Sequence, residues 1–295
     1  MRTSTSRDAD VARARAALAR HRLRFPSQVA NSARNAHAEG DRHERWASAR
    51  DALWRFLDPH LREGARVAVL GAGNGDDLPL DRIAARAGSV TLIDLDRAAS
   101  RRARRRLPWR ARRHVGAIGH DVTGGVADRI AVAAALEEPP GRIAAPEAPL
   151  PGAPYDLAIG DLLYSQLLYP ALLDLGVEER RRDALLARWC PLLTRATVAR
   201  LHASAPLVVH VHDPLAWWAG HEQTVDLEPI LRIAEAEGTE AALSTVARGI
   251  GPVESDPREA LRIFGIETRA TALWHWPFSE GVDYLACATL AAEAP

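Results

Sequence analysis

The chain has 295 residues, 47% of them hydrophobic and 26% charged, as expected for a globular protein of one α/β domain with an appendage. Its formal net charge is zero, which argues against a nucleic-acid partner, because binding phosphates requires a basic surface. All 38 basic residues are Arg, so Schiff-base chemistry on a lysine is excluded. Cys190 and Cys287 form no disulfide framework or metal motif, and neither a signal peptide nor a membrane span is visible. We therefore expect a cytoplasmic protein without a metal site.

The first 63 residues predict a helical extension that precedes the sheet and covers its ligand-binding end as a lid. A helix is expected from Asp8 to Arg24, with Pro26 ending it. A polar segment follows at 31–45. A second helix is expected over 41–63, because Trp46, Ala49, Leu53, Phe56 and Leu57 recur at helical spacing.

From residue 64 to residue 295, hydrophobic strands alternate with helices, which is typical of a doubly wound α/β domain. Strands are expected at 66–70, 89–95, 114–118, 155–160, 207–212, 271–276 and 282–290. Helices are expected at 78–87, 96–107, 126–136, 178–189, 192–202 and 227–237, the fourth and fifth of these separated by Pro191. A Pro-rich insertion at about 137–154 predicts irregular structure on the surface. The last two strands form a hairpin, whereas a dinucleotide-binding domain would end on a parallel strand.

The most informative segment is 67–77, a hydrophobic strand that breaks into alternating glycines followed by two acids. Gly71, Gly73 and Gly75 let the backbone turn tightly and approach a ligand closely. The pattern is G-x-G-x-G, and Asp76 stands where a dinucleotide fingerprint has its third glycine. An acid there repels a pyrophosphate but suits a ligand with amino and sulfonium charges.

Acidic residues also follow the next strands. Asp94 ends the second strand, where a carboxylate can accept both hydroxyls of a ribose, and Asp96 is expected to cap the following helix. Asp94 is expected to be exposed, so that replacing it leaves the fold intact. Asp121 follows the third strand, and it could equally be a turn former. Asp161 follows the fourth strand.

These features together resemble the class I S-adenosylmethionine-dependent methyltransferases over residues 64–290. The resemblance implies a seven-stranded, mostly parallel sheet with an antiparallel last strand. It also implies S-adenosylmethionine as cofactor and S-adenosylhomocysteine as product. The cofactor-binding residues that it implies are Gly71, Ala72, Gly73, Asn74, Gly75, Asp76, Asp94, Leu95, Asp121, Val122 and Asp161.

The acceptor side is less defined. In some amino-methyltransferases an Asp/Asn-Pro-Pro-aromatic turn follows the fourth strand, and here Asp161 and Tyr164 remain while both prolines are leucines. Asp161 and His212 are the candidate catalytic residues, His212 as a base or as a structural histidine. Tyr164, His212 and Trp217 are the candidate substrate-binding residues, and other Trp residues, Trp276 among them, are candidate pocket wall.

The leading hypothesis is methyl transfer to O or N of a small molecule. Three alternatives stay open: an RNA or protein methyltransferase that docks through the Arg-rich block 97–113, an inactive cofactor-binding protein, and a nicotinamide-dependent oxidoreductase. A solvated helix face is the simpler interpretation of the Arg block. The sequence leaves the oligomeric state open, with a homodimer as one option.

Overall fold

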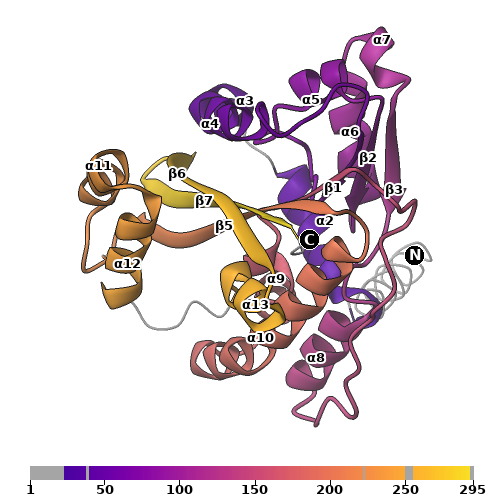
Figure 1. The fold of residues 1–295 in the computed structure, drawn as a ribbon. Coiled ribbons are helices and arrows are strands. Elements are labelled where there is room, and N and C mark those ends of the chain that lie inside the picture. Colours follow the sequence, from indigo (N-terminus) through magenta and orange to yellow (C-terminus); the bar gives the residue numbers. More distant parts are fainter. Residues whose placement is uncertain (1–22, 38–39, 222, 250–254, 293–295) are drawn as a thin grey trace, which may run out of the picture.

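The structure, a computed structural model, describes residues 23–37, 40–221, 223–249 and 255–292 (Figure 1). Most of the helix expected at 8–24 therefore lies outside the described residues. The strands are β1 (Arg66–Leu70), β2 (Ser89–Asp94), β3 (Val115–Gly119), β4 (Leu157–Asp161), β5 (Leu207–Trp218), β6 (Glu267–Ser279) and β7 (Val282–Ala292). Within the described part of the chain, no helix has the length and apolarity that crossing a membrane requires.

The strands form one seven-stranded sheet in the order β3-β2-β1-β4-β5-β7-β6. β1 to β5 pair in parallel, and β7 runs antiparallel between β5 and β6. This arrangement confirms the predicted fold class, including the antiparallel last strand. The closing hairpin is longer than predicted, since its strands cover Glu267–Ser279 and Val282–Ala292. β5 is also longer than predicted, and it pairs with β7 from Leu207 to Trp218 with a register shift between His212 and Leu215.

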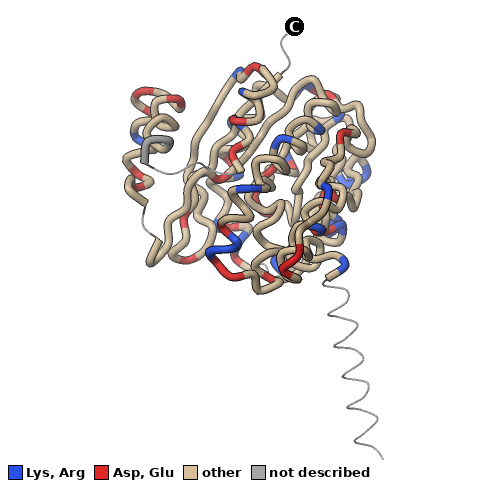
Figure 2. The backbone as a smooth tube through the Cα atoms, turned by 90° about the horizontal axis from the view of Figure 1, so that it is seen from below, with Lys and Arg blue, Asp and Glu red and all other residues tan. Residues whose placement is uncertain are grey.

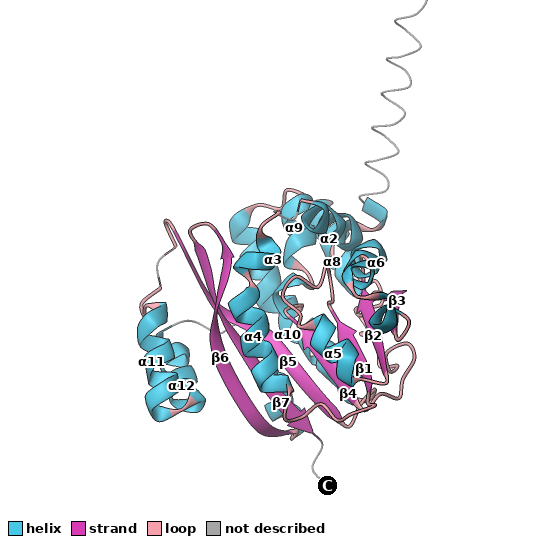
Figure 3. Ribbon diagram, turned by 90° about the horizontal axis from the view of Figure 1, so that it is seen from above, coloured by secondary structure: helices cyan, strands magenta, loops and turns pink. Residues whose placement is uncertain are grey.

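Helices cover both faces of the sheet (Figure 3). Their bounds are α2 (Pro26–Ala36), α3 (Arg42–Arg45), α4 (Ala47–Leu57), α5 (Leu80–Arg86), α6 (Arg97–Arg106), α7 (Trp109–Arg112), α8 (Val126–Ala135), η1 (Tyr164–Gln166), α9 (Tyr169–Asp174), α10 (Glu179–His202), α11 (Leu227–Glu237), α12 (Thr239–Gly249) and α13 (Pro257–Phe264). α4 and α5 pack on one face of the sheet, and α8, α10 and α13 pack on the other. The pair α11–α12 lies beside the far ends of β5 and β7.

Strand alternation divides the buried side chains between two cores. Val67 and Val69 of β1 belong to the core under α4 and α5, whereas Ala68 and Leu70 belong to the core under α8 and α10. Burial on both faces explains why the strand is a continuous hydrophobic run, which is typical of parallel sheets.

The N-terminal helices differ from the prediction. Pro26 begins α2 instead of ending a helix, because the fixed φ of proline and its missing N–H suit the first turn. The segment expected to be polar coil is therefore largely helical. The helix expected over 41–63 is two helices that meet at Trp46, and the second ends at Leu57, shortly before Pro59.

Two further predictions are wrong. Pro191 does not separate two helices, because α10 continues through it from Glu179 to His202. Cys190 and Leu193 on either side of it are buried in the core, and this packing outweighs the hydrogen bond that proline removes. The region after residue 237, where no helix was predicted, contains α12 and α13.

The Pro-rich insertion is irregular, as predicted, and it packs against α10. The Leu150 amide donates to Ser204 Oγ at 2.7 Å, and Arg200 Nε donates to the Ala148 carbonyl at 2.7 Å. The Leu150 side chain is buried in the core under α8 and α10. The insertion therefore covers the end of α10.

Gly71→Ala tests the tight turn after β1. Gly71 has φ +84°, and an added Cβ would lie 2.6 Å from the Asp161 carbonyl oxygen. Gly64 has a similar φ of +74° but open space around it, so Gly64→Ala is the matched control. We expect Gly64→Ala to cost about 1 kcal/mol for the left-handed backbone, and Gly71→Ala about 1–3 kcal/mol more for the clash. Urea unfolding measures both variants, and equal losses would contradict the close approach of the loops after β1 and β4.

Candidate functional site

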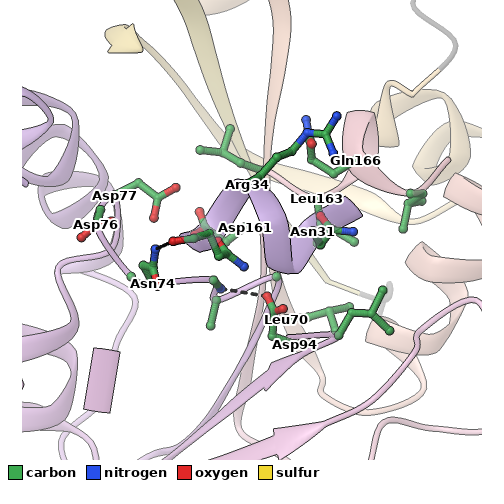
Figure 4. Close-up of a pocket in the computed structure, with 18 of the residues that line it drawn as sticks. Asn31, Arg34, Leu70, Asn74, Asp76, Asp77, Asp94, Asp161, Leu163 and Gln166 are labelled. Carbon is green, nitrogen blue, oxygen red and sulfur yellow. Dashed lines mark hydrogen bonds between the residues drawn. The ribbon is translucent and has the colours of Figure 1, made fainter. Parts of the chain in front are cut away.

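A cavity of about 490 Å³ lies at the carboxyl ends of the parallel strands. It is lined by the residues that follow β1, β2, β3 and β4. Chain order reverses between β1 and β4, and this switch point is where open α/β sheets bind their ligands. Its volume is within the range of about 300–1,000 Å³ that is typical of small-molecule sites. All the residues predicted to bind a cofactor line this cavity. Asn74, Asp76, Asp94 and Asp161 are among those labelled in Figure 4.

The glycine turn forms one wall of the cavity. Gly73 has φ +44°, and its amide donates to Asp94 Oδ2 at 2.8 Å. The amide of Asp96 donates to Asp94 Oδ1 at 2.6 Å. Asp94 is thus buried and holds the turn, which corrects the expectation of an exposed side chain. Each carboxyl oxygen keeps a free lone-pair direction, so Asp94 can still accept from a ligand. Asp96 caps α6, as predicted, by accepting from the amides of Ala98 and Ala99.

Arginines hold the turn from outside. Arg106 donates to Asp76 Oδ1 at 2.6 Å and to the Asn74 carbonyl, and Arg50 donates to the Asp76 carbonyl at 2.6 Å. Arg106 of the Arg-rich block is therefore used in contacts within the molecule, which neither a docking face nor a solvated helix face predicts. The Asp76 carboxylate is already paired. Its neighbour Asp77, which is not among the predicted cofactor-binding residues, also lines the cavity and has no ion pair among the described residues.

Asp121, which follows β3, both forms a turn and lines the cavity. Its carboxylate accepts from the Thr123 amide at 2.8 Å and from the Gly125 amide at 2.6 Å, so it forms the turn. Asp121 also lines the cavity beside Val122, and Leu95 approaches from the end of β2. These apolar side chains next to a carboxylate suit a flat heterocycle that bears an amino group.

Asp161 is buried in the centre of the site, with 2% of its surface exposed. Neither of its carboxyl oxygens has a hydrogen-bond partner among the described residues. Burial raises the pKa of Asp161 well above its usual range, and the nearby Asp77 and Asp94 raise it further. Burial also raises the pKa values of Asp77 and Asp94 to about 6. Figure 4 shows these three acids around one pocket. Acids without partners favour a cationic ligand.

The turn after β4 differs from the Pro-Pro turn of the amino-methyltransferases. Leu162 has φ +46°, a left-handed conformation that proline cannot adopt, so replacing the prolines changes the backbone as well as the side chains. Tyr164 points away from the cavity into the core, where its hydroxyl lies 2.5 Å from His210 Nδ1. The structure thus places this predicted substrate-binding residue outside the cavity lining.

His212 and Trp217 also lie away from the cavity lining. His212 is buried on the opposite face of β5, with Nε2 3.3 Å from Asp256 Oδ1 of α13, and burial lowers its pKa to about 4. Trp217 packs against α11 and donates to the Val225 carbonyl at 3.2 Å. Because alternate residues of a strand face opposite sides, Asp213 lines the cavity instead of His212.

Other lining residues were missed because they come from distant segments. Ser27, Asn31 and Asn35 form a polar stripe on α2 with a spacing of four residues, and this stripe faces the cavity. A polar stripe on a helix is usually interpreted as a solvent face, although three small polar residues in register could have indicated a covered site. Asn35 ties α2 to the glycine turn, since its carbonyl accepts from Asn74 Nδ2 at 2.9 Å.

No protein-family model matches the chain, and no curated protein does. Three solved structures similar to it are S-adenosylmethionine-dependent methyltransferases. The one from Aquifex aeolicus is 12% identical with a TM-score of 0.43, and the match covers 90% of this chain and 98% of that one. A TehB-like one from Corynebacterium glutamicum is 12% identical with a TM-score of 0.38, covering 93% and 99%. One from Thiobacillus denitrificans, in complex with S-adenosyl-L-homocysteine, is 15% identical with a TM-score of 0.39, covering 84% and 91%.

The chain has the class I methyltransferase fold. This assignment rests on the strand order and on the antiparallel position of β7. At such identities the cofactor and the acceptor must be argued from the site itself.

Asp161→Asn tests the cost of the central acid in the ligand-free protein. A carboxyl whose pKa is raised on folding stabilises the fold at pH values below its unfolded pKa, and this contribution is lost as pH rises through the folded pKa. The neutral amide should therefore raise the free energy of unfolding by about 1 kcal/mol at pH 8, or about 2–4 °C in Tm, and by less at pH 5. Calorimetric unfolding at both pH values measures this, and an equal or negative change at pH 8 would contradict it.

Proposed function

We propose that the chain is an S-adenosylmethionine-dependent methyltransferase that acts on O or N of a small molecule. The observation that carries the proposal is the wall formed by Gly73 and Asp94, facing a buried Asp161 that lacks a partner among the described residues. This wall offers a closely approachable backbone and a ribose-binding acid, and Asp161 offers a buried carboxyl group that a cationic ligand would stabilise in its ionised form. A nucleoside with a cationic amino-acid tail matches all of these features.

The lining residues fit the cofactor group by group. Asp94 would accept the ribose hydroxyls, and Asp121 with Val122 and Leu95 would surround the adenine. Asp161 and Asp77 would balance the charge of the tail. When bound, S-adenosylmethionine supplies an electrophilic methyl carbon, and the protein contributes orientation and exclusion of water.

A small acceptor is favoured by the way the cavity is enclosed. α2 crosses its opening through contacts with the glycine turn, and the hairpin β6–β7 bounds the other end. A large polyanion would also meet a chain of zero formal net charge, in which basic and acidic positions are both distributed along the backbone (Figure 2). Conversion of S-adenosylmethionine to S-adenosylhomocysteine in the presence of acceptors tests the activity. Cofactor binding without turnover on any acceptor would instead support the inactive alternative.

Titration calorimetry separates this proposal from an oxidoreductase. We expect a saturable isotherm with S-adenosylhomocysteine and none with NADH or NADPH, because the acids around the turn repel a pyrophosphate. Tight binding of a nicotinamide dinucleotide with no response to S-adenosylhomocysteine would overturn the proposal.

Asp94→Ala tests the ribose contact. We expect the affinity for S-adenosylhomocysteine to fall by about 10- to 100-fold, the range for lost hydrogen bonds to a charged group. Stability should fall as well, since the Gly73 amide loses its acceptor. Asp96→Ala is the matched control, because it removes a buried helix cap and should cost about 1 kcal/mol of stability with little change in affinity. Equal affinities in the parent and in Asp94→Ala would refute the assignment.

A further inference from the structure

The end of the cavity farthest from Asp121 is built from aromatic rings. Trp46 precedes α4, and the other rings belong to the β6–β7 hairpin. The four rings are those of Trp46, Trp276, Phe278 and Tyr284. Their centroids lie 4.9 Å apart for Trp46 and Trp276, 5.2 Å for Trp276 and Phe278, and 5.0 Å for Phe278 and Tyr284. Trp46 Nε1 also donates to the Phe278 carbonyl at 3.0 Å, which holds the hairpin against α4. All four residues line the cavity.

A carboxylate lies beside these rings. Asp213 is in β5, where the pairing with β7 shifts register between His212 and Leu215, and it lies on the face of the strand opposite His212. Ser165 Oγ donates to Asp213 Oδ2 at 3.1 Å. Burial raises the pKa of Asp213 to about 7, and burial together with the charge of Asp213 raises that of Tyr284 to about 12.

Two arginines reach the rings at this end, since the Arg42 guanidinium lies 4.9 Å from the centroid of the Trp46 ring and Arg45 donates to the Phe278 carbonyl at 3.4 Å. The carboxyl groups at this end are not neutralised in the same way. Arg42 lines the cavity and interacts electrostatically with Asp77, where it opposes the rise of that acid's pKa. Arg34 pairs with Asp174 at 3.4 Å. Asp213 has no ion pair among the described residues, and the buried Asp161 next to this region has no partner there for either oxygen. The faces of aromatic rings carry negative potential, so rings and carboxylates together attract a cation.

We propose that this aromatic subsite binds the methyl acceptor as a protonated amine on an apolar body, with Asp213 as its ion partner and proton acceptor. This inference rests on the proposed function for the transfer itself. It differs from the nitrogen-binding turn of the amino-methyltransferases, because the Leu162 turn has another backbone and the nitrogen partner comes from β5.

Atoms and electrons balance in the transfer. The ammonium nitrogen loses one proton to the Asp213 carboxylate and gains a free lone pair. That lone pair attacks the methyl carbon of S-adenosylmethionine, so a carbon–nitrogen bond forms while the carbon–sulfur bond breaks. The electron pair of the broken bond stays on sulfur, which becomes a neutral thioether. The product is a methylated ammonium ion, and the proton on Asp213 passes to solvent.

Binding of three matched probes tests the subsite in the full-length protein. The probes are 2-phenylethylamine, 2-phenylethanol and phenylacetate, which share an aromatic body and differ in the charge of the end group. Titration calorimetry is run with and without saturating S-adenosylhomocysteine. We expect the amine to bind at least about 10-fold more tightly than the alcohol, and the carboxylate more weakly than either. Equal or inverted affinities would overturn the proposal.

Variants locate the effect. Asp213→Asn should remove most of the preference for the amine over the alcohol. Phe278→Leu, which keeps the backbone carbonyl that binds Trp46, should lower amine affinity by about 5-fold. Asp183→Asn on the exposed side of α10 is the matched control, and it should leave the preference unchanged. An undiminished preference in Asp213→Asn would overturn the role of that residue, even if Phe278→Leu were poorly folded.

The readouts separate this inference from the proposed function. Binding of S-adenosylhomocysteine without amine selectivity would refute the subsite and leave the cofactor assignment standing. An amine preference that depends on Asp213, in a protein that does not bind S-adenosylhomocysteine, would keep the subsite and refute methyl transfer. Methylation of the amine from radiolabelled S-adenosylmethionine, reduced in Asp213→Asn with cofactor affinity unchanged, would support both.

Discussion

The hydrogen bond from the Gly73 amide to the Asp94 carboxylate joins the loop after β1 to the end of β2, and the arrangement of the site depends on it. It holds a left-handed glycine turn open toward the cavity. On the other side, Gly71 rests against the carbonyl of Asp161, where a methyl group would not fit. The loops after three neighbouring strands are thereby packed into one wall, and the groups of this wall that face the cavity are backbone amides and carboxyl groups.

This wall is held from outside by charge. Arg106 and Arg50 bind the glycine turn through its carbonyls and through Asp76, and they leave Asp77, Asp94 and Asp161 facing inward. Burying several acids together is unfavourable, and their raised pKa values express that cost. Buried acids of this kind cluster at functional sites, and a bound cationic ligand would offset the unfavourable free energy of burying them together.

β5 contributes to two different environments. His210 and His212 point to the side of α10 and α13, where they contact Tyr164, His202 and Asp256, and burial lowers their pKa values. Asp213 follows them on the opposite face of the strand, where it lines the cavity. A shift of one position in the strand thus separates a structural histidine cluster from the candidate acceptor site.

The sequence by itself determined the sheet, the glycine turn and the acids after β2, β3 and β4. All of these depend on local order, since hydrophobic runs, glycine spacing and residues at strand ends act within a few positions of the chain. It was misleading at Pro26 and Pro191, where local preference predicted helix ends and the packing around α2 and α10 decided otherwise.

Only the tertiary structure decided the acceptor end of the cavity. Trp46, Asp213, Trp276 and Tyr284 are up to 238 positions apart in the numbering (from 46 to 284), and they meet because α4 packs against a hairpin formed by the last two strands. Strand alternation places Asp213 on the face of β5 opposite His212, and only the packing of β5 in the sheet decided which of the two faces reaches the cavity. Contacts between distant segments follow from the path of the whole chain, and residue spacing carries no information about that path.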